Sequence, residues 1–100
     1  MLIVRRNTLD LMAALIQVMD EVVDVTGVEV RRDLGEQVQV NFGWAGNAMG
    51  NIRIEQSTTP GNPLWVCFDL NWDGGRNLVR TFNVSRGEGR IIEFIRENLS

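Results

Sequence analysis

The sequence predicts a two-layer α+β domain, with an N-terminal and a C-terminal helix packed on one face of an antiparallel meander of four to five strands. Apolar and polar residues alternate in Gln37–Trp44 and again in Leu64–Trp72, as is typical of half-buried strands. Helical patterns stand only near the two ends of the chain. When helices pack on one face of an antiparallel sheet, the helices and the sheet bury their apolar surfaces in one shared core. We therefore expect the order α-β-β-β-β-β-α in a single domain over residues 1–100.

The first predicted helix runs from Thr8 to Asp24, with Asn7 or Thr8 as its cap and Gly27 as a left-handed residue at its end. A helix on one small sheet needs an apolar arc of only about 100°, and this helix exceeds it. Either the helix is deeply buried within the chain, or it also packs on a second copy. Because a chain of 100 residues has little material to wrap both sides of a helix, we expect self-association through this helix.

Five strands are predicted between the helices, and Leu64–Trp72 is expected to be a central strand of the sheet. They are Val28–Leu34, Gln37–Trp44, Asn51–Ser57, Leu64–Trp72 and Leu78–Ser85. Between them, Ala45–Gly50 reads as a small, flexible connection and Asp73–Asn77 as a hairpin loop. Arg90–Leu99 closes the chain as an amphipathic helix.

The central strand assigns its side chains to two faces, because successive residues of a strand point to opposite sides. Phe68 falls on the core side, together with Leu64, Val66, Leu70 and Trp72. Trp65 falls on the side away from the helices. A bare Trp there requires a cover, which the Met1–Arg6 arm, a second subunit or an external partner could supply.

Composition excludes several chemistries. The chain carries a net charge of −3 and one cysteine, Cys67, and it contains neither His nor Lys. No intrachain disulfide or lysine Schiff base can form, and the commonest metal ligand and general base are missing. We expect no cofactor and no transition-metal site, duplex DNA is an unfavourable partner, and no segment is long enough to span a membrane. The simplest expectation is a cytoplasmic protein.

Several motifs have plain structural explanations. The Gly43–Gly50 stretch is glycine-rich, but a phosphate loop usually leads into a helix and often carries Lys, so we expect only a connection. The acids Glu55, Asp69 and Asp73 are expected to be solvated strand residues. The basic stretch of Arg76, Arg80, Arg86 and Arg90 could hold an anion or pair with the acidic first helix.

The function that we expect is that of a small non-enzymatic binding module, an oligomeric accessory protein that docks on a macromolecular partner. The binding candidates are Trp44, Arg53, Trp65, Trp72 and Arg80. One alternative is a small organic ligand held between the sheet and the first helix, with Met12, Met19 and Met49 lining the cavity. Another is single-stranded nucleic acid on the open sheet face.

Overall fold

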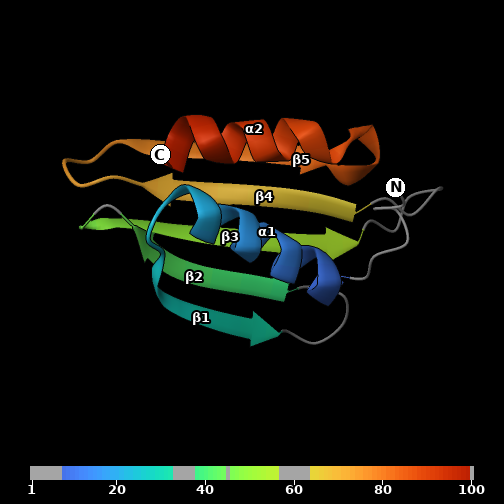
Figure 1. The fold of residues 1–100 in the computed structure, drawn as a ribbon, viewed down its shortest axis with the longest axis horizontal. Helices are drawn as coiled ribbons and strands as arrows, with labels where there is room; N and C mark the ends of the chain where they lie inside the picture. Colours follow the sequence, from blue (N-terminus) through green and yellow to red (C-terminus); the bar gives the residue numbers. More distant parts are fainter. Residues whose placement is uncertain (1–7, 33–37, 45, 57–63, 100) are drawn as a thin grey trace.

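The structure, a computed structural model, describes residues 8–32, 38–44, 46–56 and 64–99. The chain runs from helix α1 (Thr8–Val22) through five strands and a short 3-10 turn, η2 (Val84–Arg86), to helix α2 (Glu88–Leu99) (Figure 1). The strands are β1 (Thr26–Arg32), β2 (Val38–Trp44), β3 (Ala48–Gln56), β4 (Leu64–Asn71) and β5 (Asn77–Asn83). The predicted α+β order is confirmed.

The sheet is an antiparallel meander in the order β1-β2-β3-β4-β5. One row of directly opposed residues crosses all five strands on the helix side: Val30, Val40, Ile52, Phe68 and Arg80. The three central members of this row are fully buried, whereas the two end members are exposed. The helices therefore cover the middle of the sheet and leave parts of both edge strands open.

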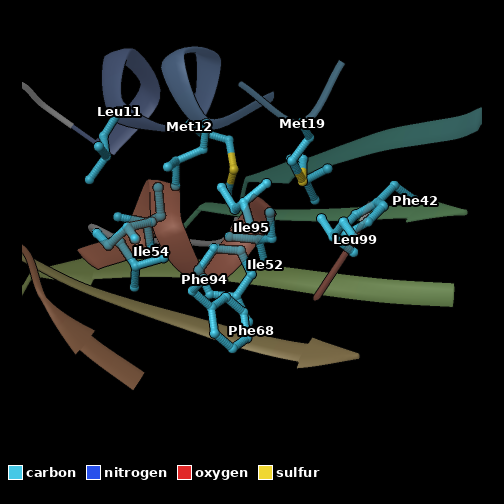
Figure 2. Close-up of a cluster of buried hydrophobic side chains, with 14 of the residues drawn as sticks. Leu11, Met12, Met19, Phe42, Ile52, Ile54, Phe68, Phe94, Ile95 and Leu99 are labelled. Atoms are coloured by element: carbon cyan, nitrogen blue, oxygen red, sulfur yellow. The ribbon is translucent and has the colours of Figure 1, made fainter. Parts of the chain in front are cut away.

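The core lies between this face and the two helices. Phe68 is 0 % exposed, and its ring packs 4.9 Å from that of Phe94 in α2 and 6.0 Å from that of Phe82 in β5. Figure 2 shows Phe68 and Phe94 below the methionines of α1. The predicted face assignment of Leu64–Trp72 is confirmed for β4, because Trp65 alternates with buried Leu64 and Val66. This strand is an interior one, next to edge strand β5, and β3 occupies the centre of the sheet.

Helix α1 contacts β2, β3 and also α2. Its buried side chains are Leu11, Met12, Leu15 and Met19. None of the large apolar side chains described in α1 is exposed. Helix α2 covers part of the apolar surface of α1 that the sheet does not reach. Self-association through α1 stays a prediction. The described helices include none long and apolar enough to cross a membrane.

Two local expectations were wrong. Gly27 does not cap α1, which ends at Val22; it lies in β1 with φ 59°, where the pairing with β2 is irregular. The second half of the Ala45–Gly50 connection is strand, because β3 already begins at Ala48.

Candidate functional site

The outer face of the sheet lies opposite the two helices, which do not cover it. The register places these residues on it: Thr26, Glu29 and Arg31 of β1; Gln39, Asn41 and Gly43 of β2; Met49, Asn51, Arg53 and Glu55 of β3; Trp65, Cys67, Asp69 and Asn71 of β4; Asn77, Val79, Thr81 and Asn83 of β5. Met49 and Val79 are 66 % and 55 % exposed. Amide side chains are the most numerous kind on this face, closely followed by charged ones, with isolated apolar groups set among them.

The outer face is hollowed over its middle strands. An open hollow of about 660 Å³ is lined by Gly27, Glu29, Asn41, Met49, Gly50, Asn51, Asp69 and Asn71. Gly43 lies in register between Thr26 and Met49 and adds no side chain to this part of the face. The hollow thus combines amide groups, two carboxylates and one exposed thioether.

Hydrogen bonds between strands hold the amides of this face in place. Asn51 Nδ2 donates to Asn41 Oδ1 at 2.8 Å and, more weakly, to Gln39 Oε1 at 3.4 Å. Asn77 Nδ2 donates to Asp69 Oδ1 at 2.9 Å and to Asn71 Oδ1 at 2.8 Å. Each donor is shared between acceptors, which fixes the side chains without enclosing them. Because these side chains are already ordered, less of their side-chain entropy would be lost when a partner binds.

Two of the predicted binding residues, Arg53 and Trp65, share the outer face. Trp65 is half-buried and stands in register between Glu55 and Asn83. Arg53 stands between Gln39 and Cys67, and its Nε is covered without a hydrogen-bond partner in the described part of the chain. Because this nitrogen is buried, a partner could reach it only if the Arg53 side chain shifted; left as it is, the unpaired donor carries a desolvation cost.

The other three predicted residues lie elsewhere. Trp44 is 2 % exposed and packs in the core, 5.6 Å from Trp72 in an edge-to-face arrangement. Arg76 Cζ covers the Trp72 ring at 4.2 Å, so Trp72 is held on two sides. Arg80 lies on the helix side of β5, with its Cζ 5.6 Å from the Phe94 ring. The structure therefore does not bring the five candidates together.

The three methionines do not line one cavity. Met12 and Met19 are buried in the core, whereas Met49 lies on the opposite face of the sheet. This detail of the small-ligand alternative was wrong, because β3 begins earlier than expected and carries Met49 to the outer face.

The charges of the outer face are mixed. Arg31 and Arg53 stand against Glu29, Glu55 and Asp69. Such a surface lacks the positive field that a nucleic-acid backbone requires. Across the described ranges, no three His, Cys, Asp or Glu side chains gather into a site that could hold a metal ion.

No known protein family, curated protein or solved structure matches this chain. The sequence analysis missed Met49, Asn51 and Val79 as outer-face residues. Extending the alternation of β3 back from Arg53 would have found the first two.

Proposed function

We propose that this chain is a small cytoplasmic interaction module, without catalytic activity of its own, that docks on another protein through the outer face. One observation carries the proposal: a pre-ordered amide surface with a hollow displays Met49, Val79 and Trp65 on the side that the helices leave bare. Reversible protein interfaces are only about as apolar as the rest of a protein surface, so isolated apolar groups among hydrogen-bonding groups are compatible with one.

The composition of the face favours a protein partner. Trp, Met and Arg are enriched in protein interfaces and Lys is depleted, and the outer face offers the first three. Side-chain amides both donate and accept, so they pair with the polar groups of a peptide backbone in either direction. The hollow, about 660 Å³, has room for one or more partner side chains.

Single-stranded nucleic acid is the less favoured occupant. Base-stacking platforms combine aromatic side chains with a basic groove, and the outer face has one aromatic, Trp65, and more carboxylates than guanidinium groups. A fluorescently labelled oligothymidine should show no anisotropy change at physiological salt. Tight, salt-dependent binding would replace the proposed protein partner with nucleic acid.

The absence of His and Lys from the sequence supports a non-catalytic role, because it removes the usual groups for acid–base and nucleophilic chemistry near neutral pH. The single cysteine favours a reducing compartment.

Affinity capture with matched variants tests the proposal. Trp65→Ala and Met49→Glu alter the outer face, whereas Gln17→Glu alters an exposed position of α1. A protein captured by the wild type and by Gln17→Glu, but not by the outer-face variants, should then be purified and titrated. We expect Trp65→Ala to weaken that complex by about 2 kcal/mol, the scale of an interface hot spot. Equal affinity of all four proteins would contradict docking on this face.

A further inference from the structure

Edge strand β1 displays apolar side chains that nothing in the described structure covers. Val28 and Val30 are 45 % and 52 % exposed, and Val30 is on the helix side, in register with buried Val40. Figure 1 shows β1 at the margin of the sheet, beyond α1. An exposed edge with an open ladder is a template for another strand.

The charges of β1 are complementary to those of a second β1. Two identical antiparallel strands related by a two-fold axis perpendicular to the sheet must have one residue opposite its own copy. Centring on Glu29 opposes two glutamates, and centring on Arg31 opposes two arginines. Centring on Val30 opposes the two valines and places each Glu29 opposite Arg31 of the second copy, which forms two pairs of opposite charge on the outer face.

No charged residue of β2 lies directly opposite Glu29 or Arg31. Within the sheet, Glu29 stands opposite Asn41 and Arg31 opposite Gln39, both neutral amides. The irregular pairing between Thr26 and Glu29 ends the regular ladder, so pairing would be confined to the second half of the strand. The interface uses the same patch on both copies and therefore closes as a dimer.

We propose that a second copy of this chain pairs with β1 in the register centred on Val30. The two sheets then form one continuous sheet with both helix layers on the same side. Because Gly27 and Glu29 also line the hollow of the outer face, the dimer places two hollows on either side of the seam. The dimer does not depend on the proposed docking function.

The opposite edge is less suited to pairing. Arg80 points to the helix side of β5 and covers Phe94. A charge directed inward at an edge strand is a known obstacle to edge-to-edge association.

Charge reversal and charge exchange test the register. Sedimentation of the wild type should show a dimer. Glu29→Arg and Arg31→Glu should each weaken it about tenfold, because each turns two opposite-charge pairs into like-charge pairs. The double variant Glu29→Arg/Arg31→Glu should restore it. Thr81→Arg, an exposed change opposite Cys67 on β5, is the matched control and should leave the dimer intact.

A disulfide supplies a second test. Directly opposed residues of antiparallel strands have Cα atoms about 4.5–5.5 Å apart, within the range of a disulfide. In a Cys67→Ser background, Val30→Cys should form a covalent dimer on mild oxidation. Val28→Cys should not, because its own copy would lie roughly 14 Å away along the strand.

A wild-type monomer at 200 µM, or a dimer that resists both charge reversals, would overturn the proposal. So would efficient cross-linking through Val28→Cys and not through Val30→Cys. A dimer dissociated by Ala13→Glu alone would place the interface on α1 instead.

Discussion

Gly50 shows what a missing side chain does in this fold. It lies on β3 opposite Phe42, and a Cβ built there would come 2.6 Å from Phe42 Cζ and 3.1 Å from Leu70 Cδ2. The absence of a side chain at Gly50 thus makes room for the Phe42 ring. The sequence did not predict this contact, because Gly50 was expected in a connection between strands.

We expect Gly50→Ala to destabilise the protein by about 1–3 kcal/mol, the usual cost of overpacking. Gly89→Ala is the matched control: it lies in α2 with nothing within 4 Å of the new Cβ. It should be neutral or stabilise by about 0.4–1 kcal/mol. Urea denaturation measures both, and equal stabilities would show that Phe42 does not occupy this space.

Phe68 anchors the core through two other aromatic rings, those of Phe82 and Phe94. Phe68→Ala should cost about 3–5 kcal/mol, since it removes buried surface and leaves a cavity. That loss is a large part of the stability of a small domain. A variant with near-normal thermal melting would contradict the assigned register of β4.

The alternation of apolar and polar residues predicted which face of the sheet a side chain occupies, because a strand has only two faces. It placed Phe68 inward and Trp65 outward correctly. It could not show that Trp72 lies between Trp44 and Arg76, because that arrangement joins the ends of two hairpins. Pattern gives the face of a side chain but not its neighbours.

At the scale of elements, the two helices illustrate the same limit. The wide apolar arc of α1 indicated that much of the helix surface is buried, but it did not indicate which element packs on that surface. Helix α2, far away in sequence, contacts α1 and supplies part of the cover. The order and type of the elements were predictable because each has its own period, whereas contact between the helices depends on the whole sheet.

Ala13 gives a direct test of the outer side of α1, where it is exposed. The proposed seam at β1 predicts that Ala13→Glu leaves the oligomeric mass unchanged by sedimentation, whereas self-association through α1, which the sequence predicts, would be weakened by this variant. Dissociation of an assembly by this variant would instead support association through α1.

For the whole molecule, the two faces of the sheet differ in burial and in the kind of side chain they carry. One face forms the core with both helices, and the outer face carries ordered amides, the hollow and Trp65. Sequence alone predicted that one face of the sheet stays open, but the hollow depends on the actual start of β3 and on the register of Met49 with Gly43.

Trp65→Ala separates folding from binding at this scale. Because Trp65 is half-buried on the outer face, we expect the variant to stay within about 1 kcal/mol of the wild type in stability and to lose partner binding. A large drop in melting temperature would show that the Trp65 ring is structural cover.

The most direct measurement uses Cys67, the single cysteine of the chain, which is free and half-buried on the outer face beside Arg53. Its rate of alkylation by iodoacetamide should be measured by mass spectrometry in buffer and in an extract of the cells that make the protein. A Gln17→Cys variant in a Cys67→Ser background reports on exposed α1 as the control. Docking on the outer face predicts that the extract slows alkylation of Cys67 but not of the control, and that Trp65→Ala abolishes this protection. Equal protection at both positions, or none at Cys67, would contradict it.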